Sequence, residues 1–572
     1  MLAHTLPARR TVKGMRLVWR HAPLVSDDPV VVWQGVLEAR GLDERDSFFA
    51  PRLADLPDPF AMRDMDVAAS RVAEAVRAGE PIHVFGDFDC DGVCGTAILV
   101  EALHAAGGRV SCSIPHRADD GHGIGVSAVE QAHASGARLG ISVDTGTTCF
   151  EACARARALG LDMIVSDHHL PEASLPPALA VLNPARADCG FAERRLCGTG
   201  VAFFLLMAAW RRLAGLGQRP AFDLRRLLDR VAVATVADVM DLLGVNRILV
   251  HHGLAQLNRT PSVGLRALLA VSRVRQPVDA EAIAFHLAPR INAAGRLAHG
   301  EQAMRLLATQ DGAEAEQLAA ELDQANRLRR RIEQETFKEA ERKLGDDSVL
   351  AVYDRAWHAG VVGLVAGRLA RKHGRPAAVG FVDGDGQHIR LSLRGRPGFH
   401  IGALLRACAT HLRGFGGHAG AGGGTVAIES WPAFRAAFAE AVAEQAARVR
   451  DHLQLPVDGM LGLAALHHGL AVRLARFAPF GAGNRPCTWL LPEVQVVARK
   501  DLRGGVTRLV LGDGVRQVRA VSFQDASVRD HLLPGRKVSV LGSLQVDDWQ
   551  GHARVQFVIE DLLGGEDAHG AG

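Results

Sequence analysis

Four short apolar, β-rich runs alternate with Ala-rich helical segments between residues 60 and 270. They read "IHVF" (82–85), "VSCSI" (110–114), "LGISV" (139–143) and "MIVS" (163–166). Strands separated by helices of this length are joined by crossover connections, which make them parallel neighbours in one sheet. The pattern therefore predicts an α/β domain with a parallel sheet. In such a sheet the carboxyl ends of the strands lie along one edge, where ligands usually bind.

The first of these runs is followed by three carboxylates at alternate positions. The segment "GDFDCDG" (86–92) carries Asp87, Asp89 and Asp91, which share one face if residues 82–91 continue as a strand. Two like charges about 4 Å apart repel by about 1 kcal/mol in water and about 4 kcal/mol at an effective dielectric near 20. We therefore expect a cation among these carboxylates.

Two other interpretations match part of the acidic segment. A solvated acidic turn is the usual fate of a lone D-x-D in a loop. A calcium EF-hand matches D-x-D-x-D-G, but it requires a bidentate acid at the twelfth position, where this chain has Ile98. The EF-hand also requires a preceding helix, whereas a β-rich run precedes this loop. We therefore expect a strand, an acidic loop and then a helix that opens at Gly92 and runs through Ala97 to Ala106.

Further acids and histidines follow the other apolar runs. Asp144 comes directly after "LGISV", and "SDHH" places Asp167, His168 and His169 after the next run. Asp238 follows an apolar stretch that could be helical. One such residue alone would suggest a helix cap or a satisfied core histidine, but together they indicate a metal site. Carboxylate and imidazole ligands without thiolates favour Mn²⁺ or Mg²⁺ over Zn²⁺, and two ions about 4 Å apart would serve a phosphoryl displacement.

The rest of the chain divides into recognisable parts. Residues 311–345 predict one long polar helix that bridges domains, and residues 348–430 are again α/β in character. The segment "GFGGHAGAGGG" (414–424) has the composition of a flexible loop. After the helical segment 431–450, five short strands suit a small OB-type barrel.

Charge and cysteine content narrow the class of protein. The net charge is only +3, but residues 361–420 hold nine Arg or Lys against two acids, and residues 471–520 hold nine against three. The basic charge therefore lies in the second half of the chain, although most such runs are solvated faces. The nine cysteines form no CxxC pair, which favours a reducing compartment without disulfides or zinc. With no apolar core in "MLAHTLPARR" and only 11 residues in "GVAFFLLMAAW" (200–210), we expect a cytoplasmic location and no membrane span.

An ordered set of motifs resembles one family across nearly the whole chain. The set includes "GDFDCDG", "VDTG", "SDHHLP", "NPARADC", "GTGVAFFL", "TVADVMDL", "NRIL", "RINAAGR", "WHAGVVGLVAGRL", "GGHAGAGG" and "FGAGNRP". These motifs are similar to those of the DHH phosphoesterases, and as a set to the RecJ branch. The resemblance implies an N-terminal segment (1–55), a DHH domain (56–270), a helical connector (271–345), a DHH-associated domain (346–450) and an OB-like domain (451–565).

The resemblance also implies roles for individual residues. Its metal ligands fall on Asp89, Asp91, Asp144, His168 and Asp238, with Asp87 nearby. Asp144 would bridge the ions, His169 would face the scissile phosphate, and the catalytic set would be Asp144, His168 and His169. The glycine-rich segment would become an ordered turn facing phosphate. DNA contacts are implied for Arg117, His122, Arg290, Asn292, Arg296, Ser392, Arg394 and His418, of which Arg117, Ser392 and Arg394 would form a 5′-phosphate pocket.

The implied function is 5′→3′ hydrolysis of single-stranded DNA in DNA repair and recombination, with two Mn²⁺ or Mg²⁺ ions and a metal-bound hydroxide as nucleophile. A single-strand-binding protein or a helicase is an implied partner. The chain departs from the family pattern at "LSLRG" (391–395), at Gly-His-Gly (121–123) and at Phe85. Two alternatives remain: a DHH phosphoesterase acting on small phosphates or short oligonucleotides, and a non-catalytic DNA-binding scaffold.

Overall fold

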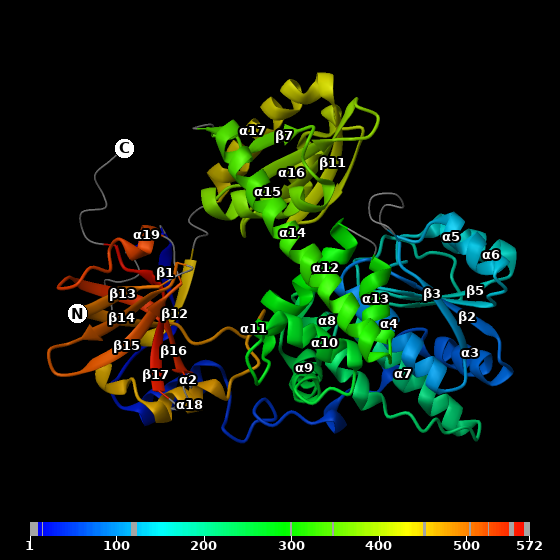
Figure 1. Ribbon diagram of the computed structural model, residues 1–572, viewed down its shortest axis with the longest axis horizontal. Helices are drawn as coiled ribbons and strands as arrows, with labels where there is room; N and C mark the ends of the chain where they lie inside the picture. Colours follow the sequence, from blue (N-terminus) through cyan, green and yellow to red (C-terminus); the bar gives the residue numbers. More distant parts are fainter. Residues whose placement is uncertain are drawn as a thin grey trace. The chain divides into compact units, whose positions relative to one another are not determined.

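The computed structural model of the chain divides it into two units (Figure 1). The first combines Met1–Ala50, Val449–Phe480 and Asn484–Gly572, and the second combines Pro51–Arg448 with Gly481–Gly483. The structure describes residues 10–13, 15–115, 123–297, 300–345, 348–449, 454–502, 505–523, 526–547 and 554–564. Over these residues, no helix combines the length and the apolar character needed to cross a bilayer.

The first domain of the second unit is built on a parallel five-stranded sheet with the order β3-β2-β4-β5-β6. Its strands are β2 (Pro81–Gly86), β3 (Arg109–Ser113), β4 (Leu139–Val143), β5 (Asp162–Ser166) and β6 (Ala180–Leu182). The predicted parallel sheet is confirmed, with the short strand β6 in addition. Because β3 lies on one side of β2 and β4 on the other, the strand order reverses between β2 and β4. Ligands bind in open α/β sheets at the carboxyl ends of strands that flank such a reversal.

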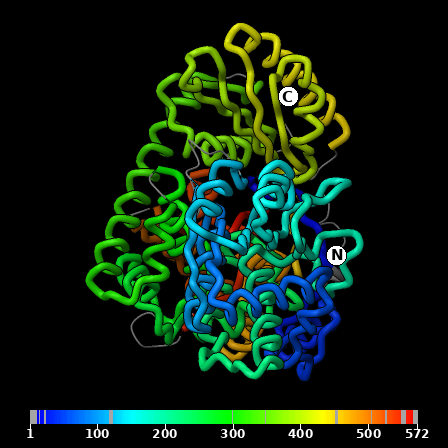
Figure 2. The backbone as a smooth tube through the Cα atoms, turned by 90° about the vertical axis from the view of Figure 1, so that its right-hand side faces the viewer, coloured from blue at the N-terminus to red at the C-terminus, as the bar shows by residue number. Residues whose placement is uncertain are grey.

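Helices cover both faces of this sheet (Figures 1 and 2, blue to blue-green). They are α3 (Met65–Ala78), α4 (Cys90–Ala105), α5 (Val126–Ala134), α6 (Phe150–Leu159) and α7 (Gly198–Gly215). Ile82 and Val84 of β2 pack with α3, α4 and α7 in one core, whereas Phe85 packs with α5 and α6 in another. The alternation of side chains along a strand thus places a hydrophobic core on each face.

Strand β2 ends at Gly86, so residues 87–91 do not continue it, and the expected order of strand, acidic loop and helix is confirmed. Helix α4 begins at Cys90, and Asp89 is its N-cap. The Asp89 carboxylate accepts hydrogen bonds from the N–H groups of Asp91 and Gly92, at 2.9 and 3.2 Å. These bonds satisfy donors of the first helical turn, and they turn the chain out of the extended conformation.

A helical region follows the sheet and leads into a second domain of the same unit. It comprises α8 (Leu228–Ala237), α9 (Gly244–Leu257), α10 (Val263–Ser272), α11 (Ala280–Ala282), the π-helical turn η5 (Ile283–Leu287), α12 (Ala288–Leu297), α13 (Gly300–Ala308) and α14 (Gly312–Leu344); 3₁₀ turns precede it at η2 (Leu53–Asp55), η3 (Pro59–Ala61) and η4 (Leu224–Leu227). The predicted long polar helix is α14, which is thereby confirmed. Its residue Phe337 packs into the core of the second domain.

The second domain has a mixed sheet with the order β10-β11-β9-β8-β7. Its elements are β7 (Ala351–Asp354), α15 (Ala359–His373), β8 (Ala377–Val382), β9 (His388–Arg394), α16 (Ile401–Ala407), η6 (Ala409–His411), β10 (Gly414–Gly417), β11 (Ala421–Ala427), η7 (Ile428–Ser430) and α17 (Trp431–Arg448). The glycine-rich segment forms the hairpin β10–β11, so the flexible loop suggested by composition is wrong and the ordered turn is confirmed. Glycine is needed there because a Cβ at Gly417 would lie 2.7 Å from Gly422 Cα and 2.8 Å from the Ala421 carbonyl oxygen.

The first unit contains the predicted barrel. The five predicted strands are β13 (Trp489–Asp501), β14 (Thr507–Gly512), β15 (Gln517–Ser522), β16 (Lys537–Asp547) and β17 (Arg554–Leu562), and the pairing of β13 with β16 closes the barrel. Its helical elements are α2 (Pro29–Ala39), η8 (Leu463–Ala465), α18 (His468–Ala475) and α19 (Ala526–Arg529). Strand β1 (Arg16–Val25) pairs in parallel with β12 (Gln454–Met460), which extends the sheet. The described residues up to Ala50, which fall in the implied N-terminal segment (1–55), therefore belong to this unit.

Candidate metal centre and cleft

The carboxyl ends of β2, β4 and β5 bring the predicted metal ligands together. Asp87 and Asp89 lie in the loop after β2, Asp144 follows β4, and His168 and His169 follow β5. Asp91 lies in the first turn of α4, and Asp238 ends helix α8, so the apolar stretch before it is helical. Within each of the following groups, ligand atoms lie within 4.8 Å of one another: Asp144 with Asp167, His168 and His169; Asp91 with His168 and Asp238; Asp87 with Asp89 and Asp144.

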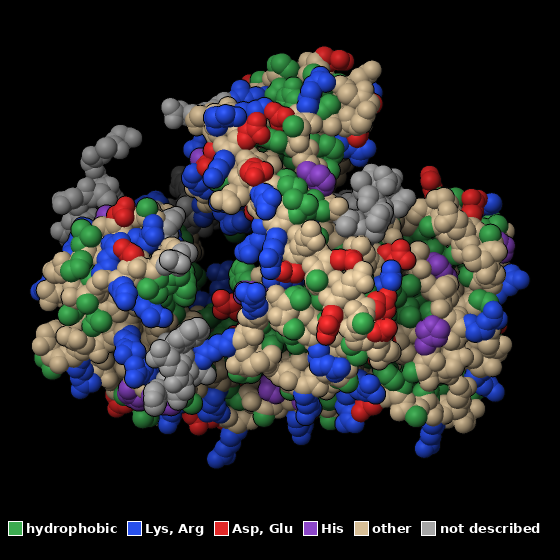
Figure 3. Space-filling view, viewed as in Figure 1, with side chains coloured by type: hydrophobic (Ala, Val, Ile, Leu, Met, Phe, Trp, Pro, Cys, Tyr) green, Lys and Arg blue, Asp and Glu red, His purple; other side chains and the backbone are tan. Residues whose placement is uncertain are grey.

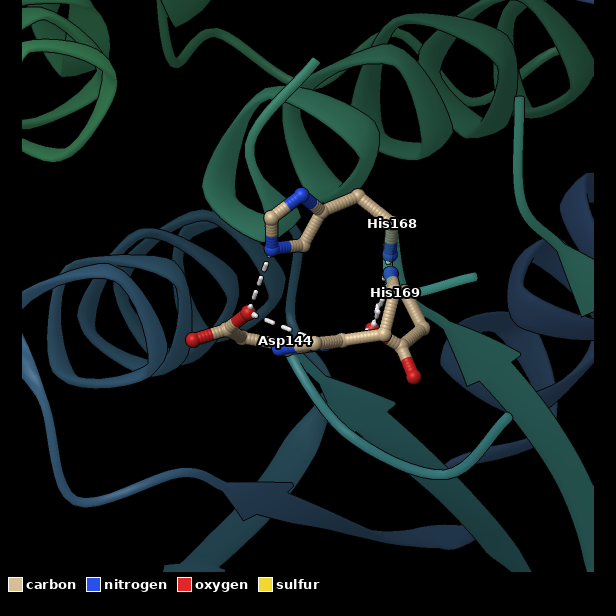
Figure 4. Close-up of side chains that lie close together, drawn as sticks. Asp144, His168 and His169 are labelled. Atoms are coloured by element: carbon tan, nitrogen blue, oxygen red, sulfur yellow. Dashed lines mark hydrogen bonds and ion pairs between the residues drawn. The ribbon is translucent and has the colours of Figure 1, made fainter. Parts of the chain in front are cut away.

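His168 is at the centre of these carboxylates. Its Nε2 lies 3.1 Å from Asp144 Oδ1, 3.5 Å from Asp238 Oδ2 and 3.9 Å from Asp91 Oδ2. Figure 4 shows the His168 ring pointing toward the Asp144 carboxylate. Burial lowers the pKa of His168, although the carboxylates around it oppose this shift. A neutral imidazole directed at several carboxylates is a suitable metal ligand.

Two buried oxygen atoms of this site have no hydrogen-bond partner among the described residues: Oδ1 of Asp144 and Oδ2 of Asp238. Burial, and then the nearby charges of Asp91 and Asp89, raise the pKa of both carboxyls, that of Asp238 to about 8. Buried polar atoms are normally paired, and a divalent cation would pair both and offset the repulsion. The donor set of carboxylates and one imidazole therefore fits Mn²⁺ or Mg²⁺.

Asp91 is oriented by the amino end of helix α7. Its Oδ2 accepts from Gly198 N–H at 2.6 Å and its Oδ1 from Thr199 N–H at 2.8 Å, while the Thr199 hydroxyl donates to the Asp91 carbonyl at 2.7 Å. Helix N-termini stabilise negative charge. The motif "GTG" (198–200) thus positions a predicted metal ligand, a role that its sequence pattern did not reveal.

Asp144 has an unusual backbone conformation, with φ of 60°. Such left-handed conformations are uncommon for residues other than glycine, and they concentrate at functional sites. A Cβ at Gly198 would lie 2.6 Å from Asp144 Cβ and 2.7 Å from its Cα. Only glycine at position 198 therefore lets α7 approach Asp144 this closely.

Asp167 positions His169 and belongs to the site without having been predicted as a ligand. Its Oδ1 lies 2.8 Å from His169 Nδ1 and accepts from the His168 N–H at 2.7 Å, while its Oδ2 accepts from Thr147 N–H at 2.9 Å. The hydrogen bond to Asp167 raises the pKa of His169 to about 9, against the effect of burial. Burial alone would raise the pKa of Asp167, but these hydrogen bonds lower it. The sequence signal for the pair of Asp167 and His169 is therefore the first residue of the "DHH" triplet.

Helix α12 links the metal centre to the second domain. Asn292 Oδ1 accepts from the Cys90 N–H at 2.8 Å, and a Cβ at Gly295 would lie 2.4 Å from the Phe88 carbonyl. Arg290, in contrast, pairs with Asp323 of α14 at 2.8 Å and donates to the His286 carbonyl at 2.7 Å. The structure thus places Asn292 against the acidic loop and holds Arg290 in a contact between helices. Two residues predicted to contact DNA, Arg117 and His122, lie outside the described residues.

The other predicted DNA contacts line one cavity of about 980 Å³. Arg296 at the end of α12, Ser392 and Arg394 on β9, and His418 at the tip of the glycine hairpin all contribute to its wall. Arg394 Nη1 donates to Ser392 Oγ at 3.0 Å, and both side chains lie on one face of β9. The structure therefore brings these four residues together in a cleft, which we call the hairpin cleft.

Three family models match successive parts of the chain. The DHH family N-terminal domain matches residues 81–235, the DHHA1 domain matches residues 346–444, and the RecJ OB domain matches residues 457–561. The chain is also similar to the single-stranded-DNA-specific exonuclease RecJ of Dickeya dadantii (strain 3937). The two are 35% identical over 526 residues, which cover 86% of this chain and 89% of that protein. The chain belongs to the RecJ family.

Solved RecJ structures resemble the whole chain. RecJ of Thermus thermophilus in complex with Mn²⁺ matches with a TM-score of 0.78 at 32% identity, covering 94% of this chain and 76% of that one. The same RecJ in complex with Mg²⁺ matches with a TM-score of 0.73 at 30% identity, covering 96% and 79%. The carboxylate and imidazole donors of this RecJ family member fit both ions, Mn²⁺ and Mg²⁺.

Proposed function

We propose that this chain is a single-stranded-DNA-specific exonuclease that hydrolyses phosphodiester bonds from the 5′ end, in DNA repair and recombination. The observation that carries the proposal is the pair of buried carboxylate oxygens on Asp144 and Asp238 that have no hydrogen bond among the described residues, at the point where the strand order reverses. A cluster of this kind is expensive to keep without cations. The intact ligand set also favours an enzyme over a non-catalytic scaffold.

We assign the metal ligands to Asp87, Asp89, Asp91, Asp144, His168 and Asp238. Two divalent ions held there would neutralise charge on the phosphate and lower the pKa of a bound water molecule. The amino end of α7 holds the Asp91 carboxylate in place through two N–H donors. Asp144, which belongs to two of the three ligand groups, is the candidate bridging ligand.

His169 is the candidate for direct contact with the scissile phosphate. Its side chain is 59% exposed, and its Nδ1 is bonded to Asp167. With a pKa of about 9 the ring is protonated at neutral pH, so Nε2 is a second donor and can bind a phosphate oxygen as charge develops. Such charge-assisted hydrogen bonds are about twice as strong as neutral ones.

The polarity of hydrolysis is assigned to the hairpin cleft. Ser392 and Arg394 present a hydroxyl and a guanidinium from one face of β9, a combination suited to a terminal phosphate. Glycine-rich backbone next to them lets N–H groups approach an anion closely. A 5′-phosphate held in the cleft, with the help of Arg117, would set how far the first internal linkage lies from the metal ions, so that cleavage proceeds from the end.

The barrel of the first unit is assigned to binding the strand. Lys500, Arg508 and Arg519 are exposed on its strands, and Lys500 lies directly across from Arg508. Arg499 is bound instead to Asp501 and to the Arg529 carbonyl, and Arg503 lies outside the described residues. Basic strands of an OB fold track the phosphate backbone of single strands. A single-strand-binding protein or a helicase in the cytoplasm is the partner that we expect.

Digestion of end-labelled single strands tests the proposal. Wild type should release mononucleotides from the 5′ end with Mn²⁺ or Mg²⁺ and be inactive in EDTA. Folded Asp144→Ala should lose at least ~10³-fold in rate, by analogy with removal of a major transition-state stabiliser. Near wild-type digestion by folded Asp144→Ala would rule out the proposed site.

A second comparison tests the 5′ end. Wild type should prefer 5′-phosphorylated over 5′-hydroxyl strands, and Arg394→Ala should lose most of that preference. Equal slowing of both substrates would remove Arg394 from the phosphate pocket. Faster hydrolysis of dinucleotides than of long strands by wild type would instead favour the alternative function on short oligonucleotides.

A further inference from the structure

A second cavity, of about 410 Å³, lies beside the hairpin cleft in the same unit. It is formed by α12, α14, α15 and the π-helical turn η5, helices that pack against one another. None of the predicted metal ligands lines it. Its volume is in the range typical of small-ligand sites. We call it the arginine pocket.

Five arginines line the arginine pocket: Arg296, Arg329, Arg330, Arg371 and Arg394. Glu333, paired with Arg329 at 3.2 Å, is the one acidic side chain in its wall among the described residues. Burial lowers the pKa of Arg329, and the neighbouring Arg330 lowers it further. So many like charges around a small volume repel one another unless an anion lies between them. Figure 3 shows Lys and Arg side chains gathered on the surface near α14.

Two buried atoms in the wall lack partners. Asn326 is 3% exposed, and its Oδ1 has no hydrogen bond among the described residues. Nε of Arg329 is also buried and without a hydrogen bond there. Because unpaired buried polar groups cost about 1–3 kcal/mol each, their presence in one wall points to a ligand with both a donor and an acceptor.

The arginine pocket also has an apolar rim. Phe285 lies on the π-helical turn and is 68% exposed, and Leu364 of α15 is nearby in the wall. π-helical turns are rare and are frequent at functional sites. An exposed aromatic ring next to guanidinium groups is the combination that binds a base and its phosphate. The lining therefore suits a nucleotide better than an inorganic anion.

The two cavities share part of their walls. Arg296 and Arg394 line both the hairpin cleft and the arginine pocket. Between them, helix α15 presents Gly363, where a Cβ would lie 2.9 Å from Ser392 Oγ and 3.1 Å from Arg394 Nη2. A phosphate released from Ser392 and Arg394 can therefore stay in contact with Arg394 as it passes from one cavity to the other.

We propose that the arginine pocket binds the released deoxynucleoside 5′-monophosphate and so forms a product-exit site. This inference rests on the proposed function. Arg329, Arg330 and Arg371 hold the phosphate after it leaves Arg394, Phe285 stacks on the base, and Asn326 accepts a hydrogen bond from the nucleotide.

Calorimetric titration of the full chain with dTMP in EDTA tests the site without catalysis. Phe285→Ala, Arg330→Ala and Arg371→Ala should each weaken dTMP binding on the order of tenfold, as expected for loss of a stacking or charge-assisted contact. Arg331→Ala is the matched control for Arg330→Ala, because Arg331 is an exposed arginine on α14, the helix of Arg330, and lies outside the pocket wall. It should change dTMP binding less than twofold. Equal weakening by the control, or no change in the three variants, would overturn the proposal. Equally tight binding of inorganic phosphate would show an anion site only and would also overturn it.

Product inhibition supplies the second readout. Added dTMP should inhibit multiple-turnover digestion of single strands by wild type, and about tenfold more dTMP should be needed with Arg330→Ala or Phe285→Ala. Single-turnover cleavage should be unchanged in both variants, since neither residue lies among the metal ligands or the wall of the hairpin cleft. Unaltered inhibition in the variants would contradict a product-exit role. If wild type failed to cleave DNA at all, the titrations in EDTA would still decide whether the pocket binds nucleotide.

Discussion

Replacing Asp238 by Asn separates two effects of the acidic cluster on stability. The cluster lowers the free energy of unfolding of the metal-free protein, and it raises that of the metal-bound protein by binding the ions. The Asp238 side chain is 28% exposed and lies 3.5 Å from His168 Nε2. Burial and the charges of Asp91 and Asp89 raise its pKa from 3.8 to about 8. Asparagine keeps the shape of the side chain and removes its charge at every pH.

The expected effect follows from the two pKa values. Between pH 3.8 and about 8 the unfolded chain ionises at this residue while the native protein keeps its proton. The native state then binds more protons, so the free energy of unfolding of the metal-free protein falls as pH rises through this window. At pH 7 the loss is at most about 4 kcal/mol. Metal-free Asp238→Asn should avoid this loss and be the more stable protein at pH 7, with the difference vanishing near pH 4.

Thermal unfolding in EDTA and in excess Mn²⁺ provides the assay, across pH 5 to 8. In EDTA the variant should have the higher Tm, and the difference should grow with pH. In Mn²⁺ at 1,000 times the dissociation constant, wild type gains about 4.1 kcal/mol and the variant loses a ligand. The difference should therefore nearly vanish at pH 7 and reverse at pH 5, where the loss in the metal-free wild type is smaller. Asp241→Asn is the control, because Asp241 pairs with the exposed Arg195 outside the ligand groups. A metal-free variant less stable than wild type at pH 7, or one with the full Mn²⁺ response, would refute the reasoning.

Three further predictions concern the surroundings of the metal centre and the barrel. Gly198→Ala would place a Cβ 2.6 Å from Asp144 Cβ and should lower the free energy of unfolding by about 1–3 kcal/mol. It should also weaken Mn²⁺ binding measured by calorimetry, and an unchanged Mn²⁺ affinity would contradict the close approach of α7 to Asp144. Asp167→Asn should let the pKa of His169 fall from about 9 toward its ordinary 6.5. The decrease of kcat on the alkaline side of the pH profile should then move to lower pH. An unchanged profile would exclude His169 as the protonated group that catalysis requires. Replacing Lys500 and Arg508 together by Ala should make the salt dependence of oligo-dT binding shallower by about 0.7 for each lost phosphate contact, as anisotropy titrations at several salt concentrations would show; an identical slope would place the strand elsewhere.

The parts of the metal centre that depend on which residues follow one another in the sequence could be predicted. Apolar runs followed by Asp144 and by Asp167 indicated strand ends, and parallel strands necessarily bring such ends to one edge. The alternation at Asp87, Asp89 and Asp91 did not by itself distinguish a strand from a loop, because the same spacing serves a loop and a helix cap. Asp89 as N-cap stops the extended conformation, a preference that period-2 alternation cannot reveal.

Features that depend on distant contacts were not predictable. The hydrogen bonds from the α7 amino end to Asp91 join residues 107 and 108 positions apart, and the pair of Arg290 with Asp323 depends on how α12 packs on α14. Composition alone made the glycine-rich hairpin look flexible, although its strands pair with each other and with β9. The two cavities that share Arg394 arise from three helices and a sheet, which no single segment indicates.

The pairing of β1 with β12 has a consequence for synthesis of the protein. Arg20 of β1 bonds to Asp458 of β12 across 438 residues of chain. At about 5–20 residues per second on the ribosome, roughly 20 to 90 s pass between emergence of the two strands. Throughout that interval β1 is an open strand edge without its neighbour, which is the kind of surface that invites aggregation. A chaperone that shields β1 until β12 has been synthesised would therefore protect the nascent chain from this aggregation.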